Sequence, residues 1–177
     1  GTYRILNMET DNLVTFPKVH VENSVFYASA DAGNSNFKLV YVKNSNPTNA
    51  GITSFILRNT TFINTHYLGQ GIVSGDISTM IVKNNIIYAD NNNNNVTVFR
   101  KRGNSSALLT ATDGEVADNI GYIKGDFYLN LWQGNTPPLE NAEKIQKLDA
   151  SPFETLDKST GTYVLKPEYQ GYGAAIE

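Results

Sequence analysis

Arg58 and Lys83 are the two side chains whose type and spacing best suit a binding reaction. Each stands one place before an asparagine in a matching stretch, FILRNTTFIN at 55–64 and MIVKNNIIYA at 80–89. If these stretches form neighbouring strands, the two cations lie side by side on one outward face. Because arginine binds a carboxylate through two parallel hydrogen bonds, the pair could hold the carboxylate of a uronate sugar.

We expect this pair to lie beside a groove that binds the sugar. Further polar residues are expected to border that groove: Ser74, Asp76, Arg100 and Arg102. A second interpretation of the cations stays open. Arg58 and Lys83 fall in one column with Glu22 and Asp118, so their charges could simply compensate one another across neighbouring strands.

Catalytic chemistry has weaker support in the sequence. His20 and His66 are far apart and have no local partner, and the sequence contains no cysteine. Asp76 and Asp90 are the only carboxylates near the expected groove, which is fewer than calcium prefers. No carboxylate pair suited to glycoside hydrolysis can be identified. We therefore predict no catalytic residue, no metal site and no cofactor; calcium is possible but unsupported.

The two matching stretches belong to a repeat with four copies. The others are VHVENSVFYA at 19–28 and EVADNIGYIK at 115–124. The shared asparagines are Asn23, Asn59, Asn84 and Asn119. An apolar residue stands two places before each asparagine, and an apolar or aromatic residue stands three places after it. The residue directly before each asparagine is charged and must face water. This alternation of inward and outward positions predicts strands.

A second strand-like run follows each copy. These runs are FKLVYV at 37–42, GIVSG at 71–75, VTVFR at 96–100 and FYLNLW at 127–132. Units this short cannot bury their apolar faces alone and must stack. We therefore predict an all-β fold, a right-handed single-stranded parallel β-helix, or solenoid.

The repeated asparagines have two explanations. In stacked coils about 4.8 Å apart, inward amides can hydrogen-bond along a ladder of their own kind. Alternatively, asparagine is simply a common turn residue. The shared pattern of neighbours favours the ladder.

The spacing of the four asparagines predicts a groove. Because they are separated by 36, 25 and 35 residues, the first and third coils carry extra residues. The excess lies near 44–53 and at 101–114. Stacking would place these two loops on one edge, on either side of the shorter coil.

Composition sets further limits. The 177 residues have 40% hydrophobic and 18% charged residues and a formal net charge of −3. This suits one domain, and no basic stripe suggests nucleic acid. No apolar run is long enough to span a bilayer. No apolar signal sequence opens the chain, and a secretion signal could have been removed.

The C-terminal part contains the one predicted helix, TPPLENAEKIQKL at 136–148. Leu139, Ala142, Ile145 and Leu148 form an apolar stripe on this helix. We expect it to cover the open end of the solenoid. No comparable cover is evident in residues 1–17, so we expect missing coils or a further N-terminal domain of a longer protein.

Residues 149–177 resemble a closing module of bacterial proteins. The matching residues are Pro152, Phe153, Gly161, Tyr163, Leu165, Lys166, Pro167 and Gly173. Ser151 replaces an aspartate, and the Ser-Pro-Ala of that module is missing. Together with the repeats, this segment resembles the right-handed parallel β-helices of the pectin lyase-like superfamily, over about residues 19–174.

The resemblance implies a secreted protein of the bacterial cell surface. We expect a single domain, 1–177, acting as a non-catalytic module associated with a polysaccharide. A polysaccharide lyase or glycoside hydrolase and a structural spacer or adhesin are the alternatives, because this fold serves many functions.

Overall fold

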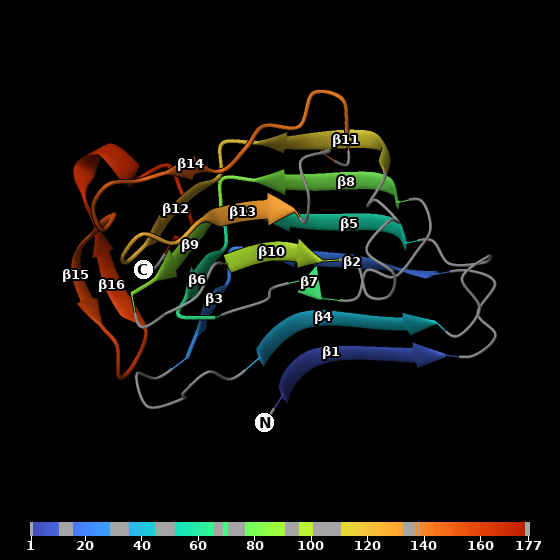
Figure 1. Cartoon of the computed structure of the whole chain (residues 1–177), viewed down its shortest axis with the longest axis horizontal. Helices are drawn as coiled ribbons and strands as arrows, with labels where there is room; N and C mark the ends of the chain where they lie inside the picture. The colour runs from blue at the N-terminus through green and yellow to red at the C-terminus, as the bar shows by residue number, and fades with distance from the viewer. Residues whose placement is uncertain are drawn as a thin grey trace.

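A computed structural model describes residues 2–10, 16–28, 36–44, 52–65, 69–70, 77–90, 96–100, 111–132, 137 and 139–175. These residues form an all-β structure in which the strands stack in layers (Figure 1). All strand pairs but one are parallel, and the exception is a C-terminal hairpin. The predicted all-β class with parallel sheets is therefore confirmed.

The first sheet contains the strands that lead up to the repeated asparagines. In spatial order these are β11 (Ala111–Ala117), β8 (Ile77–Lys83), β5 (Ile52–Arg58) and β2 (Phe16–Glu22). The register aligns Glu22 with Arg58 and Arg58 with Lys83, as the repeat predicts.

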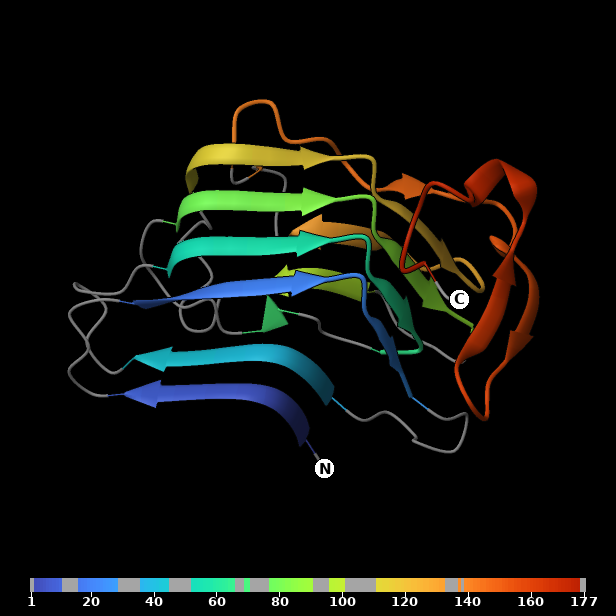
Figure 2. The same ribbon diagram turned by 180° about the vertical axis from the view of Figure 1, so that it is seen from behind.

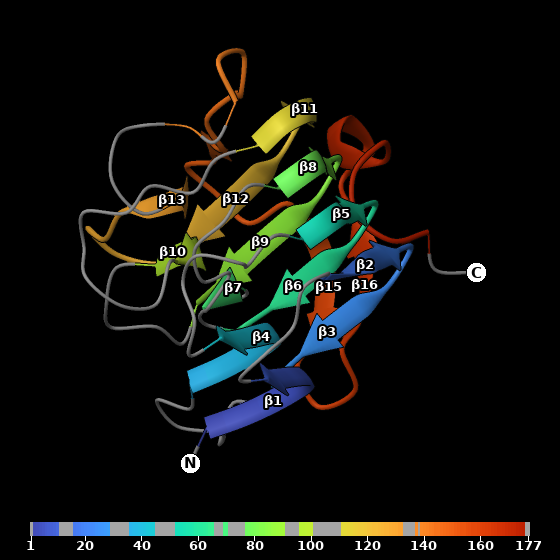
Figure 3. The same ribbon diagram turned by 90° about the vertical axis from the view of Figure 1, so that its right-hand side faces the viewer.

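The second sheet contains the strands that follow the turn. Its order is β14 (Gln146–Lys147), β12 (Ile120–Ile123), β9 (Ile86–Ala89), β6 (Thr61–Ile63) and β3 (Val25–Tyr27). A two-residue turn separates each of these four strands of the first sheet from its successor in the second. The two sheets therefore meet at a sharp corner (Figure 3).

A third layer contains the second strand-like runs of the repeat. Here β13 (Leu129–Trp132), β10 (Val96–Arg100) and β7 (Gly69–Gln70) form one parallel sheet. The strands β1 (Thr2–Thr10) and β4 (Asn36–Asn44) form another, next to it in Figure 2. The runs predicted at 37–42 and 96–100 are thus strands, and so are residues 129–132 of the run predicted at 127–132, whereas 71–75 lies outside the described residues.

The chain visits the three layers in a fixed order. We call one visit a pass: β2–β3–β4, β5–β6–β7, β8–β9–β10 and β11–β12–β13. Each pass pairs with the next in parallel in the first and second sheets. In these sheets, equivalent residues of successive passes therefore form rows across the stack.

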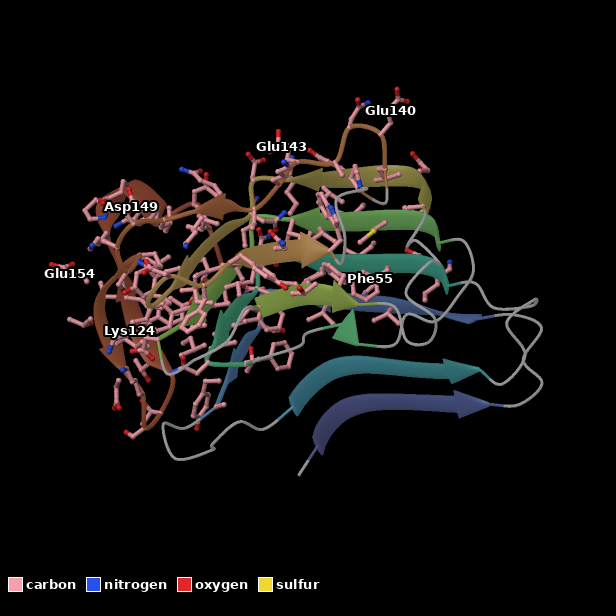
Figure 4. All side chains as sticks on the ribbon, in the orientation of Figure 1. Phe55, Lys124, Glu140, Glu143, Asp149 and Glu154 are labelled. Carbon is pink, nitrogen blue, oxygen red and sulfur yellow. The ribbon has the colours of Figure 1, made fainter. Side chains whose placement is uncertain are left out.

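Rows of apolar side chains fill the space between the layers. Leu57 and Val82 are each 1% exposed, and Phe62 is fully buried. Phe55 lies on the first sheet (Figure 4). Its ring meets that of Phe99 of the third layer edge to face, with ring centroids 5.5 Å apart. Each such side chain contributes about 1.5–3 kcal/mol by leaving water.

The C-terminal hairpin covers the outer face of the second sheet. It comprises β15 (Phe153–Asp157) and β16 (Thr162–Leu165), followed by the short 3₁₀ helix η2 (Pro167–Tyr169). Its rings pack on outward residues of β9, with Phe153 and Tyr88 centroids 5.0 Å apart. Both faces of the inner strands β6 and β9 are thereby buried, whereas Tyr27 of the edge strand β3 is 45% exposed.

The prediction of a helix over residues 136–148 is wrong. Residues 139–141 form a turn, residues 142–145 are irregular and β14 follows; residues 136 and 138 are outside the described part. The open edge of β12 explains the difference. Gln146 N donates to Asn119 O at 2.8 Å and Leu148 N to Gly121 O at 2.7 Å, so the segment gains sheet hydrogen bonds instead of helical ones.

This segment lies along the outer edge of β12 and next to the end of β11. Gly121 stands in the inward row where earlier passes have Phe26, Phe62 and Ile87. A Cβ at Gly121 would lie 2.3 Å from Leu129 and 2.8 Å from Ile145. The side chain of Ile145 thus fills space that a larger residue fills in earlier passes.

Candidate functional site

The repeated asparagines make the corner between the first two sheets. Asn23, Asn59 and Asn84 have φ of 45°, 49° and 55°, the left-handed conformation that asparagine tolerates well. In the fourth pass Asp118, with φ 52°, takes this position. Asn119 is therefore one place out of line with the other three.

The predicted inward ladder of Asn23, Asn59 and Asn84 is wrong. Asn23 is exposed and the other two are half-buried, so these three serve as turn residues. Their backbones link the passes: Asn23 N donates to Arg58 O at 3.2 Å and Asn59 N to Lys83 O at 3.1 Å. The turn-residue interpretation therefore holds for them.

A polar file does run inside the corner, one residue further along the chain. Its members are Ser24, Thr60, Asn85 and Asn119. The Asn85 Nδ2 donates to Asn119 Oδ1 at 2.8 Å and to Leu57 O at 3.0 Å. Both asparagines are buried, so these bonds satisfy groups that water cannot reach.

The same file also bonds to the backbone of neighbouring passes. Asn85 Oδ1 accepts from Thr60 N at 3.1 Å, and Asn119 Oδ1 accepts from Asn85 N at 3.2 Å. Asn119 Nδ2 donates to Val82 O at 2.8 Å. The sequence signal for this file was the dipeptide of Asn or Asp followed by Ser, Thr or Asn, present in all four passes.

The two candidate ligand-binding cations are paired with carboxylates. Arg58 donates to Glu22 at 3.0 Å. Lys83 Nζ lies 2.6 Å from Glu115 and 3.7 Å from Asp118. The hydrogen bond that Lys83 donates to Glu115 raises the pKa of Lys83, although partial desolvation opposes this shift. This geometry agrees with charge compensation across strands.

The remaining predicted site residues cannot be placed beside this pair. Ser74, Asp76 and Arg102 lie outside the described residues, as do most of both long loops. Arg100 ends β10, whose backbone pairs with Gln70. The loop-edged groove predicted from the spacing therefore stays a prediction.

The histidine that can be placed lies on the outer face of the first sheet. His20 is exposed, and its Nε2 lies 3.3 Å from Ser54 Oγ. His66 is outside the described part. Within the described segments, no three His, Asp or Glu side chains gather closely enough to hold a metal ion.

Asp90 forms a cluster that sequence reasoning missed. Its carboxylate accepts from Asn64 Nδ2 and from Tyr88 OH, each at 3.0 Å, and pairs with Lys158 of the hairpin turn. Burial raises the pKa of Asp90, but the bonds from Lys158, Asn64 and Tyr88 outweigh it and lower the pKa. Burial and the Asp90 charge raise the pKa of Tyr88. The cluster fastens the hairpin to the second sheet.

A groove of about 580 Å³ lies between the corner turns and the C-terminal segment. Asn23 and Asn59 form one side, and β16 and the tail form the other. Its lining residues are Asn23, Asn59, Tyr163, Val164, Leu165, Gln170, Gly171, Tyr172, Gly173, Ala174 and Ala175. None is charged, and they combine amide groups with tyrosine and aliphatic surface. We call this the corner groove.

The tail that forms the groove is held by specific hydrogen bonds. Gly173 N donates to Asn84 O at 2.7 Å, and Ala175 N donates to Asn23 Oδ1 at 2.8 Å. The Tyr163 hydroxyl lies 2.7 Å from Thr61 Oγ1 and donates to Ala174 O at 2.9 Å. Burial raises the pKa of Tyr163, although these two bonds oppose the shift.

Comparison with models of known families, with characterised proteins and with solved structures gave no significant match. Among the described residues, no helix is both long and apolar enough to cross a bilayer. Of the residues that carry the resemblance in the C-terminal segment, Phe153 and Tyr163 are buried and pack the hairpin, Gly173 is buried in the tail, and Pro167 is exposed.

Proposed function

We propose that the passes wind as a single-stranded, right-handed parallel β-helix. The fixed order of the three layers and the parallel pairing of every pass with the next support this winding. Parallel strands joined by a crossover are right-handed in about 98% of cases, which supports the hand. The likeness of the repeats to the pectin lyase-like superfamily is part of the same proposal.

We further propose that the chain is a non-catalytic carbohydrate-binding module, secreted to a bacterial surface. The observation that carries this proposal is the uncharged lining of the corner groove. The amides of Asn59 and Gln170 can donate to and accept from sugar hydroxyls. The half-buried ring of Tyr172 can pack on the apolar face of a sugar.

The charges favour a neutral or N-acetylated sugar over a uronate. A uronate at Arg58 and Lys83 would have to displace Glu22, Glu115 and Asp118 from pairs that already exist. The corner groove has no cation to bind a carboxylate. A neutral glycan needs only the hydrogen bonds that its amides supply.

Calorimetric titration of neutral, N-acetylated and uronate oligosaccharides tests this function. We expect saturable binding of a neutral or N-acetylated glycan, weakened about 3–10-fold by Gln170→Ala, the effect of one lost hydrogen bond. Gln146→Ala, an exposed change on β14, is the matched control and should leave binding unchanged. Equal affinities for the two variants would contradict the proposed site.

The alternatives give different results in the same samples. An unsaturated uronide product, seen by ultraviolet absorbance, would identify a polysaccharide lyase. Absence of both binding and product would favour the structural spacer. One observation supports the spacer specifically, because Glu22–Arg58 and Lys83–Glu115 leave this outward charge row internally neutralised.

A further inference from the structure

The two ends of the stack differ. At one end, β14 pairs with β12, and Glu143 N donates to Val116 O of β11 at 2.7 Å. At the other end, β2 and β3 are the outermost strands of the first and second sheets (Figure 3). We call the edge formed by Phe16–Glu22 and Val25–Tyr27 the β2–β3 edge.

Inside the stack, the carbonyls that precede the turns at Arg58 and Lys83 each accept a hydrogen bond from the turn of the preceding pass, from Asn23 N and Asn59 N respectively. Arg58 O accepts two hydrogen bonds, one from Asn23 N of the preceding pass at 3.2 Å and one from Thr60 Oγ1 at 3.0 Å. Glu22 holds the same position in the first pass. In the part of the chain that the structure describes, Glu22 O accepts only from Ser24 Oγ, at 2.8 Å. One acceptor position therefore faces outward.

The donors follow a matching rule. The first residue of each second-sheet strand donates to the preceding pass: Thr61 N to Ser24 O at 2.9 Å, Ile86 N to Thr60 O at 3.0 Å and Ile120 N to Asn85 O at 3.0 Å. Val25 N is the equivalent donor of the first pass, and it has no acceptor among the described residues. The β2–β3 edge thus offers one donor and one acceptor at fixed spacing around the turn.

Burial shows the same incompleteness. Leu57, Val82 and Val116, which occupy one inward row, are 1%, 1% and 2% exposed. Val21, in the same row of the first pass, is only half-buried. Among the described residues this row is covered at one end and not at the other.

We propose that the β2–β3 edge binds a strand–turn–strand segment of polypeptide, in parallel, as a further pass. The N–H of a left-handed Asn or Asp at its turn would donate to Glu22 O, and the carbonyl that follows would accept from Val25 N. An apolar residue two places before the turn would cover Val21, and a cation one place before it would face Glu22. These are the features of the chain's own repeat.

A second folded copy of the chain is not the expected occupant. Its β11–β12 end is covered by residues 139–148, so it cannot present parallel strands there. Two copies meeting through their β2–β3 edges would be related by a two-fold axis, which makes the strands antiparallel. The edge therefore suits an extended segment that supplies its own turn.

The probe is a labelled peptide with the sequence of residues 52–65, ITSFILRNTTFINT. In the folded protein this segment pairs with β2 and β3 on the side of those strands that faces the stack. We expect saturable binding, measured by fluorescence anisotropy. The control peptide has Pro at the position of Asn59, since proline fixes φ near −65° and cannot form the left-handed turn. It should bind at least tenfold more weakly. No binding, or equal binding of both peptides, would overturn the proposal.

Two further measurements locate the site. Amide hydrogen exchange of Val25 should slow at least tenfold with peptide bound, and that of Val164 on the hairpin should not. Val25→Pro removes the outward N–H without removing a hydrogen bond to the described residues, so the variant should fold and bind at least tenfold more weakly. Undiminished binding by a folded Val25→Pro variant, or a complex with two protein copies, would contradict this assignment.

Discussion

At the scale of single residues, two neighbouring polar positions have different tasks. The first makes the left-handed turn, and the second points inward and satisfies backbone groups of adjacent passes. Asn84 and Asn85 illustrate the division, because only Asn85 is buried and bonded to Asn119. Both tasks suit asparagine, so its presence alone does not say which task a given residue performs.

The turn role can be tested at Asn59. Asn59→Gly should leave stability nearly unchanged, because glycine enters the left-handed region freely. Asn59→Val should cost about 1–2 kcal/mol or more, because a β-branched side chain clashes there. Chemical denaturation of both variants measures the difference. Equal losses would contradict the turn role.

Asp90 predicts a dependence of stability on acid. Because its pKa is lowered on folding, its contribution is complete above the ordinary value of 3.8 and is lost as pH falls through the lower folded pKa. Asp90→Asn should therefore destabilise at neutral pH and flatten the loss of stability below about pH 4. Urea unfolding across this range measures it.

Glu154→Gln, an exposed change on the same hairpin, is the control for Asp90 (Figure 4). It should leave the neutral-pH stability near that of the original chain. An acid profile of Asp90→Asn that matches the unmodified protein would contradict the role of the cluster.

At the scale of elements, sequence patterns predicted strands better than they predicted the C-terminal part. The alternation around Arg58 and Lys83 identified strands of the first sheet, and VTVFR at 96–100 coincides with β10. The 136–148 segment carries apolar residues at helical spacing. Its final structure was decided by the unpaired edge of β12, a tertiary feature that local sequence does not show.

The cover over the end of the stack predicts a cost for Ile145→Ala. Ile145 is 8% exposed and fills the space above Gly121. Its truncation should cost about 2–5 kcal/mol, the usual cost of such a cavity. Thermal unfolding measures the loss. Lys144→Ala, an exposed neighbour, is the control, and similar effects of the two changes would contradict this packing.

The docking of the C-terminal tail depends on one glycine. Gly173 has φ 71°, and a Cβ there would lie 2.3 Å from Thr61 Oγ1. Gly173→Ala should therefore cost about 1–3 kcal/mol through backbone strain and displacement of the tail. At Gly171 a Cβ would meet nothing within 4 Å, so Gly171→Ala is the matched control. Equal melting temperatures would contradict the docked tail.

At the scale of the whole molecule, the sequence predicted the all-β class, the repeats and the direction of pairing. It placed the fourth repeat one residue out of register, because Asn119 was aligned with the turn residues. The structure pairs Ala117 with Lys83, which puts Asp118 at the turn. The identity of a turn residue can change from Asn to Asp, whereas the hydrogen-bonding register cannot.

The corner groove could not be predicted from the sequence. Asn23 and Gln170 line the same groove although they are far apart in the chain. Their approach depends on hairpin docking, through contacts such as Tyr163 with Thr61. The sequence marked both segments as polar and aromatic but gave no distance between them.

The central claim is that the passes stack in a register that places Asn85 against Asn119. A double-mutant cycle of Asn85→Ala and Asn119→Ala, read by chemical denaturation, measures this contact most directly. We predict a coupling free energy of about 0.5–3 kcal/mol between the two changes, and none within error in the parallel cycle of Asn84→Ala and Asn119→Ala. Additive effects for Asn85 and Asn119, with coupling for Asn84 instead, would contradict the register and the stack built on it.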